Sequence, residues 1–250
     1  MSAFGKAGWD AMFEPKVPGF PKVPLNDLAA MEAAITDKTV AIMLEPIQGE
    51  AGVIPADDAY LKGLREIADR HGLLLILDEI QTGMGRTGAL FCFEHTGVQP
   101  DIMTLGKGIG AGVPLAAVLA REEVCNFEPG EQGGTYNGNA LMVAVVAAVL
   151  AEVAAPSFLA HVNAASERLL SGLEALLVQH DLGPVRGKGL LLALDLGGGN
   201  AGVISDKALE LGLLLNAPRA DSLRFMPALN VSFAEIDQML EILDDVLSQN

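Results

Sequence analysis

The order of hydrophobic and polar positions predicts alternating strands and helices. Residues 39–44 and 73–77 are apolar runs, and the second is continuous, as is typical of a strand buried on both faces of a parallel sheet. Between them, residues 57–71 carry apolar side chains at helical spacing, with Leu64 and Ile67 on one face. A strand, a helix and a strand joined by short links predict a βαβ unit with a right-handed crossover.

A lysine in a glycine-rich loop lies between two more predicted strands, at residues 101–105 and 115–120. An Ala- and Val-rich run at 139–154 is too short to span a bilayer, and we interpret it as a buried helix. The other predicted elements are helices at 27–35, 156–180, 203–211 and 234–247, and strands at 190–196, 213–215 and 222–226.

The pattern of predicted elements changes near Pro156. A long amphipathic helix begins there, and only short strands and helices follow it. We therefore predict an α/β protein with two domains. Residues 1–155 would form part of a large domain with a mostly parallel sheet, and residues 156–250 a small C-terminal α+β domain.

Composition narrows the function classes. A net charge of −16 argues against nucleic acid and anionic membranes as partners. Half of the 250 residues are hydrophobic, which fits a large core or a surface that contacts a partner chain. The two cysteines form no disulfide framework and the start has no apolar signal segment, so we expect a cytoplasmic protein. The four histidines have no metal-ligand spacing, and no metal is expected.

Lys107 stands among four glycines between residues 104 and 114. Glycines let a flat, bulky group approach the backbone, and an amine that loses hydration becomes a nucleophile toward carbonyls. This setting suits a lysine that forms a Schiff base. Two alternatives are a phosphate loop, whose required spacing is missing here, and a glycine-rich turn with an exposed lysine.

Polar residues follow three of the apolar runs: Glu45 to Glu50, Asp78 to Gln81, and Lys107. The ends of neighbouring strands in an open α/β sheet meet in one crevice, where ligands bind. Asp78 follows a very apolar strand, and a carboxylate in such surroundings needs a cationic or N–H partner. A structural ion pair or a protonated pyridine nitrogen would meet this need.

Five stretches in this order resemble class III aminotransferases of fold type I, above all the members that act on N-acetylornithine and N-succinylornithine. They are residues 44–50, 77–88, 100–108, 133–139 and 223–229.

The resemblance implies a pyridoxal 5'-phosphate enzyme with a fold type I large domain. Lys107 would bind the cofactor as a Schiff base and move the proton, and Asp78 would hold the pyridinium N–H. Ile80 would pack on one ring face, and Gln81 would reach the ring hydroxyl. Thr135 would bind the phosphate of the neighbouring subunit's cofactor, so that a homodimer shares its active sites.

The same resemblance implies a substrate site. Glu45 would lie beside Gln81 and shape the pocket, while Glu50 and Arg224 would form the pair that gates the α-carboxylate site; a purely structural salt bridge is the alternative. The reaction would transfer the terminal amino group of N-acetylornithine or N-succinylornithine to 2-oxoglutarate in arginine metabolism.

Family members carry further large-domain sequence before the first matching stretch, including a phosphate-binding loop. We therefore expect the chain to be incomplete at its N-terminus. An inert fragment, another amino donor such as ornithine or 4-aminobutyrate, and a nucleotide-binding domain using residues 106–112 are the alternatives. The last is weak, because these glycines depart from the dinucleotide fingerprint.

Overall fold

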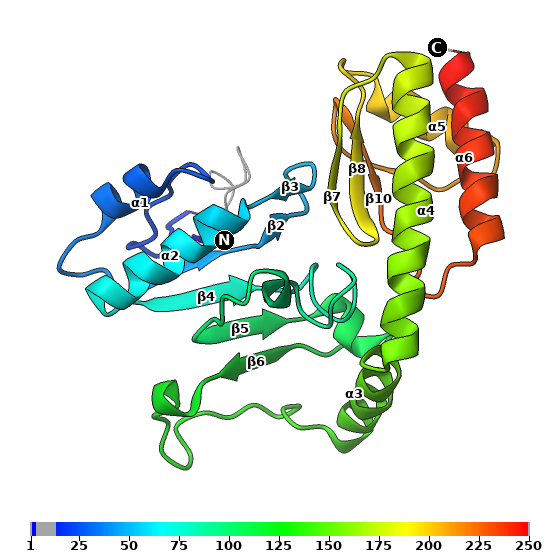
Figure 1. The fold of residues 1–250 in the computed structure, drawn as a ribbon. Coiled ribbons are helices and arrows are strands. Elements are labelled where there is room, and N and C mark those ends of the chain that lie inside the picture. The colour runs from blue at the N-terminus through cyan, green and yellow to red at the C-terminus, as the bar shows by residue number, and fades with distance from the viewer. Residues whose placement is uncertain (1, 4–13, 250) are drawn as a thin grey trace.

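Two main sheets, each with its own helices, make up the protein (Figure 1). The structure is a computed structural model, and it describes residues 2–3 and 14–249. Lys6 lies outside the described residues.

The first sheet has the order β1-β4-β5-β6 and confirms the mostly parallel sheet. Its strands are β1 (Ala41–Leu44), β4 (Leu74–Asp78), β5 (Ile102–Leu105) and β6 (Ala117–Ala120). β1, β4 and β5 are parallel, and β6 is antiparallel to β5. Around it lie α1 (Leu28–Ala34), α2 (Asp58–His71), the antiparallel pair β2 (Ile47–Gln48) and β3 (Ile54–Pro55), η2 (Cys92–His95), η3 (Lys107–Gly110), η4 (Glu122–Val124) and α3 (Ala140–Val153).

The predicted βαβ unit is β1-α2-β4. Helix α2 follows Asp57 at its N-cap and ends at Gly72, which adopts the left-handed conformation that a C-cap glycine favours. Its apolar face packs on Leu75 and Leu77 of β4. The opposite face of the first sheet is only half-covered, since the burial of β4 alternates along the strand. The prediction that residues 73–77 are buried on both faces is therefore wrong for this chain.

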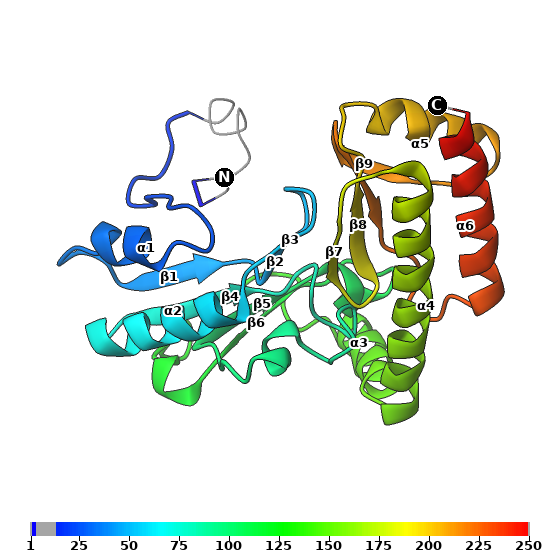
Figure 2. The same cartoon turned by 45° about the horizontal axis from the view of Figure 1, so that its top comes forward.

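The second sheet is antiparallel, with the order β7-β8-β10-β9. Its elements are α4 (Pro156–His180), β7 (Val185–Lys188), β8 (Leu191–Asp195), α5 (Ala201–Glu210), β9 (Asn216–Arg219), β10 (Ser222–Phe225) and α6 (Phe233–Ser248). Helices α4 and α6 run side by side against it (Figure 2). The division into domains 1–155 and 156–250 falls between α3 and α4, and we keep it as a proposal.

Strand β8 contributes to two hydrophobic clusters, because its side chains point alternately to the two faces of the sheet. Leu192 and Leu194 pack toward the helices, whereas Leu191 and Ala193 pack with Ile47 and Val53 of the β2–β3 region. One face of the second sheet is thus the core of the C-terminal part, and the other meets the β2–β3 region.

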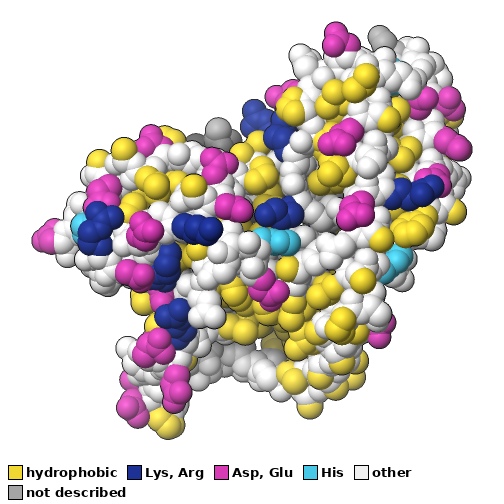
Figure 3. Space-filling view, in the orientation of Figure 1, with side chains coloured by type: hydrophobic (Ala, Val, Ile, Leu, Met, Phe, Trp, Pro, Cys, Tyr) yellow, Lys and Arg dark blue, Asp and Glu magenta, His cyan; other side chains and the backbone are white. Residues whose placement is uncertain are grey.

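Two predicted elements differ from the structure. Helix α3 is not the buried helix that its apolar sequence predicts: Leu141 is 67% exposed, and Val153 is the one buried residue of the helix. The reason is that α3 contacts η3 and the start of α4 and otherwise faces outward; hydrophobic side chains gather on the surface there (Figure 3). The strand predicted at 213–215 is displaced to β9, because pairing with β10 begins only at Asn216. Strand β7 was missed because it alternates no apolar residues.

Within the described part of the chain, no single helix is long and apolar enough to cross a membrane. Helices α3 and α4 meet the length and composition criteria only as a pair, with a bend of 67° between them.

Candidate active site

The carboxyl ends of β1, β4 and β5 meet at one edge of the first sheet, as predicted. Leu44 pairs with Leu77, and Asp78 pairs with Thr104, so Glu45, Asp78 and Lys107 follow strands that end together. Burial raises the pKa of Glu45, nearby Asp78 adds to the rise, and Lys107 opposes it. The three side chains therefore share one electrostatic environment.

Asp78 and Ile80 begin the turn that leaves β4. Asp78 is half-buried, and its Oδ1 accepts the backbone N–H of Ile80 at 3.0 Å. Ile80 lies against Gly106, where an added Cβ would come within 3.3 Å of the isoleucine methyl Cγ2. This packing places Ile80 beside the backbone that leads directly into Lys107.

Lys107 is the first residue of η3 and has a positive φ of 48°. This left-handed conformation is uncommon for a non-glycine residue and is frequent at functional sites. The expectation of a tightly enclosed amine is not met, because Lys107 is exposed. The neighbouring glycines have no side chains to cover it, and the sheet face at this edge is half-open.

A chain of polar contacts links Gln81, Glu50 and Arg224. Glu50 Oε1 accepts from Gln81 Nε2 at 3.1 Å and from Arg224 Nη1 at 2.8 Å. Arg224 Nη1 also donates to the carbonyl of Gly49 at 3.0 Å. An added Cβ at Gly49 would meet the Gln81 side-chain amide, which would have to move out of this contact. Glu45 Oε2 accepts the Gly49 N–H at 3.3 Å, so the predicted substrate residues lie together with Gln81.

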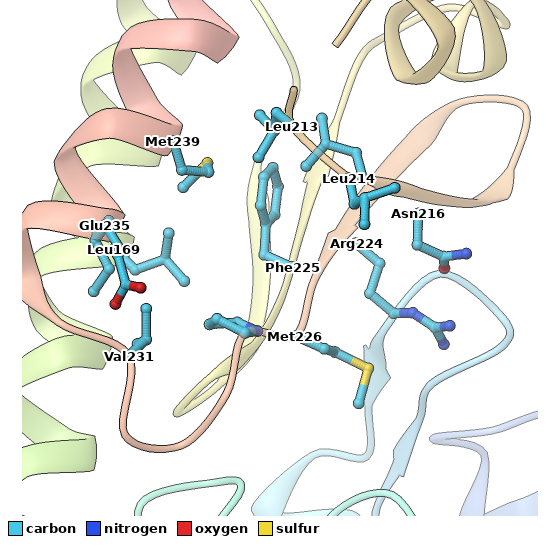
Figure 4. Close-up of a pocket in the computed structure, with 13 residues that line it drawn as sticks. Leu169, Leu213, Leu214, Asn216, Arg224, Phe225, Met226, Val231, Glu235 and Met239 are labelled. Carbon is cyan, nitrogen blue, oxygen red and sulfur yellow. The ribbon is translucent and has the colours of Figure 1, made fainter. Parts of the chain in front are cut away.

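Strand alternation explains why Arg224 reaches this site. Leu223 and Phe225 face the core under α4 and α6, so Arg224 between them faces the opposite side. Its cross-strand partner, Ala193, belongs to the cluster around the β2–β3 region. In Figure 4 the guanidinium points away from the apolar pocket and toward that region.

That pocket, of about 420 Å³, lies between α4, α6 and the second sheet. Its walls are mostly apolar, as those formed by Leu213, Phe225 and Met239 show (Figure 4). Neither Asp78 nor Lys107 lines it. Arg224 is one of its lining residues, but the candidate cofactor residues Asp78 and Lys107 are assigned to the sheet edge and not to this pocket.

Thr135 is not brought together with the other candidates. It is exposed on the loop before α3, and within the described chain no hydrogen bond joins it to Asp78, Gln81 or Lys107. Its expected role concerns a neighbouring subunit, and that role stays a prediction.

Sequence reasoning gave no role to Glu79. This residue bonds to the backbone and side chains of the loop that follows β4. Its side chain is almost fully buried, and burial raises its pKa. It accepts the N–H groups of Cys92 and Phe93 at 2.7 and 2.9 Å and the hydroxyl of Thr82 at 3.1 Å. Because successive strand residues point to opposite faces, Asp78 faces the half-open side and Glu79 the core. The sequence signal that could have revealed this role is a second carboxylate directly after Asp78 at the end of an apolar strand.

Comparison with known proteins defines the class. Residues 1–247 match the model of the aminotransferase class-III family, and the chain belongs to this family. Class III aminotransferases depend on pyridoxal phosphate.

Two curated relatives are acetylornithine aminotransferases. Acetylornithine aminotransferase 2 of Bordetella parapertussis is 57% identical over 99% of this chain, and the enzyme of Ralstonia nicotianae is 54% identical over 99%. The match covers 63% of each relative, so the chain spans less than two thirds of their length.

Solved structures agree on the fold. N-acetylornithine aminotransferase from Stenotrophomonas maltophilia is 39% identical, with a TM-score of 0.83 over 91% of this chain and 61% of that one. Ornithine aminotransferase from Toxoplasma gondii, a structure with partial occupancy of PLP at its active site, is 33% identical, with a TM-score of 0.89 over 95% and 57% of the two chains.

Proposed function

We propose that the protein transfers the terminal amino group of N-acetylornithine or N-succinylornithine to 2-oxoglutarate. The observation that carries the proposal is the convergence of Asp78, Gln81 and Lys107 at one sheet edge in a class III aminotransferase. The names of the relatives support an acylated ornithine as donor. A role in arginine metabolism and a cytoplasmic location follow as predictions.

The polar groups at this edge fit pyridoxal 5'-phosphate. Gln81 Oε1 is buried without a hydrogen-bond partner in the described part of the protein, so it can accept from the ring hydroxyl. Asp78 Oδ1 accepts a single backbone N–H, which leaves acceptor capacity for a pyridinium N–H. Exposed Lys107 can reach an aldehyde, and Ile80 offers an apolar surface for one ring face.

When bound, pyridoxal phosphate supplies an electron sink for the reacting carbon. The chain's residues supply positioning and proton transfer. Lys107 Nζ would hold the cofactor, and as a free amine it would take the proton from the donor carbon and deliver it to the carbon that came from the cofactor's aldehyde. Asp78 would keep the ring nitrogen protonated by placing a carboxylate against it. In a homodimer, the Thr135 hydroxyl would bind the phosphate of the cofactor held by the neighbouring subunit.

The pair of Glu50 and Arg224 would distinguish the two substrates. Arg224 is 12% exposed in its side chain, and Glu50 neutralises it at 2.8 Å. While paired, the arginine offers no free charge to a carboxylate. When Glu50 moves away, a guanidinium faces the site and can bind a carboxylate of 2-oxoglutarate in bidentate fashion.

Replacing Arg224 with alanine is expected to impair the 2-oxoglutarate half-reaction more than the amino-donor half-reaction. The physical reason is that only the dicarboxylate needs the freed guanidinium. Single-turnover kinetics of each half-reaction would measure this difference. Arg219→Ala, on the neighbouring β9, is the matched control. An equal loss in both half-reactions would show that the pair is only structural.

The proposed function is tested by glutamate formation from 2-oxoglutarate with four donors: N-acetylornithine, N-succinylornithine, ornithine and 4-aminobutyrate. The assay uses a form of the family's full length. An acylated ornithine is expected to give the highest kcat/KM, and a preference for a free donor would contradict the proposal. The 250-residue chain, assayed in parallel, decides whether it is an inert fragment.

A further inference from the structure

Arg86 lies in the loop that follows β4 and reaches across to the second sheet. Its Nη1 donates to the carbonyl of Pro227 at 2.7 Å and to that of Leu190 at 3.1 Å. The Arg86 carbonyl accepts the N–H of Leu190 at 2.9 Å. One residue thus fastens the site loop to the turn before β8 and to the segment after β10.

Among the described residues, the guanidinium has carbonyl oxygens and no carboxylate as partners. In the described part of the chain no salt bridge involves Arg86, and burial lowers its pKa to about 10. It therefore stays protonated at neutral pH. Arg86 is half-buried, and its two carbonyl acceptors offset part of the cost of holding a charge there. These acceptors belong to segments on either side of the second sheet's strands β8 and β10, so the guanidinium ties the site loop to both.

The backbone segments around Arg86 also lie in close contact with one another. At Gly189, whose φ is 62°, an added Cβ would come within 2.5 Å of the Arg86 carbonyl oxygen, so the position requires glycine. Ser166 of α4 donates to the Gly189 carbonyl at 2.8 Å, and Asn163 of α4 donates to the Gly88 carbonyl at 3.0 Å. Arg86 is the charged centre of this junction.

We propose that Arg86 is a positioning residue that sets the distance between Gln81 and Arg224. Gln81 lies five residues before Arg86 in the same loop, and Arg224 lies three residues before Pro227. The junction therefore holds both ends of the Gln81–Glu50–Arg224 chain in reach of each other. Its catalytic consequence rests on the proposed function.

The consequence falls mainly on carboxylate recognition. Asp78 and Lys107 both follow strands of the first sheet, whereas Arg224 belongs to the second. Loosening the junction moves Arg224 relative to the cofactor residues but leaves these residues in place among themselves. Cofactor attachment and the amino-donor half-reaction should therefore change less than the 2-oxoglutarate half-reaction.

The first test is Arg86→Lys in a form of the family's full length. The ammonium group lies one atom closer to the backbone than the guanidinium Nη1 and cannot meet both carbonyls in the same geometry. We expect KM for 2-oxoglutarate to rise by about tenfold to 100-fold, the scale of an ångström misplacement. Cofactor affinity and the donor half-reaction should change by less than about threefold. Arg168→Lys, an exposed partner of Asp237, is the matched control and should leave all values unchanged.

A second test does not depend on activity. Spin labels at Lys62→Cys on α2 and Glu174→Cys on α4 report the separation of the two parts. Cys125→Ser removes the exposed native thiol, while burial raises the pKa of the Cys92 thiol to about 12 and keeps it unreactive. Arg86→Lys should broaden or shift the distance distribution, and Arg168→Lys should not.

The outcomes separate the two proposals. An unchanged distance distribution overturns the positioning role, as does equal loss in cofactor affinity and both half-reactions. If the parent protein does not transaminate, the proposed function fails, while the distance measurement still decides the role of Arg86. Recovery of Arg86→Ala by added ethylguanidinium, in either readout, supports the role and excludes general misfolding.

Discussion

Replacing Lys107 with alanine is expected to abolish transamination while noncovalent binding of pyridoxal phosphate persists. In the proposed function the amine would both anchor the cofactor and carry the transferred proton, so no part of the reaction should proceed at a useful rate without it. Turnover and cofactor binding by absorbance, measured on the same variant, check this. Lys62→Ala, on the exposed face of α2, is the control.

The position of attachment gives an independent check on the same assignment. Borohydride reduction of the loaded parent protein, followed by peptide mapping, should place the cofactor on Lys107. Labelling at Lys6, Lys22 or Lys188 instead would contradict the assignment. Because Lys188 is in an ion pair with Asp58 at 3.8 Å, it is a suitable negative reference within the second sheet.

Replacing Asp78 with asparagine is expected to lower the transamination rate by at least about 100-fold in a form of the family's full length. The amide keeps the shape of the side chain and its contact with Ile80 but removes the negative charge that, in the proposed function, would hold the ring nitrogen protonated. The electron sink is weakened even when the cofactor is bound. Single-turnover rates with a saturating donor measure the effect.

The control for Asp78 is Asp69→Asn on α2, where the carboxylate pairs with Arg65 at the surface. It should leave the rate unchanged. A near-normal rate for Asp78→Asn would show that Asp78 only caps the turn through the Ile80 N–H. A loss matched by loss of folded protein would also count against a catalytic role, so thermal unfolding is recorded for both variants.

Local patterns were enough to predict most of the first sheet. The apolar runs before Glu45 and Asp78 form β1 and β4, and the helix between them is α2, because a strand inside a parallel sheet is rich in apolar residues and a packed helix needs one apolar face. The carboxyl-edge rule then placed Glu45, Asp78 and Lys107 together. Both inferences depend only on short-range sequence and on a general property of parallel sheets.

The same patterns predicted burial wrongly where burial depends on residues far away in the sequence. Helix α3 has the most apolar sequence of any helix here, yet most of it is exposed, because apolar composition does not say which neighbour is present. Likewise, β4 alternates between buried and half-buried positions, although its residues 74–77 are all apolar.

The sequence by itself determined the βαβ unit, the family and the set of residues that carry the candidate chemistry. Only the tertiary structure decided that Glu50 joins Gln81 to Arg224, and that Arg86 bonds to carbonyls 104 and 141 residues further along the chain. The physical reason is that such contacts follow from the face that a strand presents and from the meeting of two separate sheets. Neither leaves a periodic signal in the residues involved.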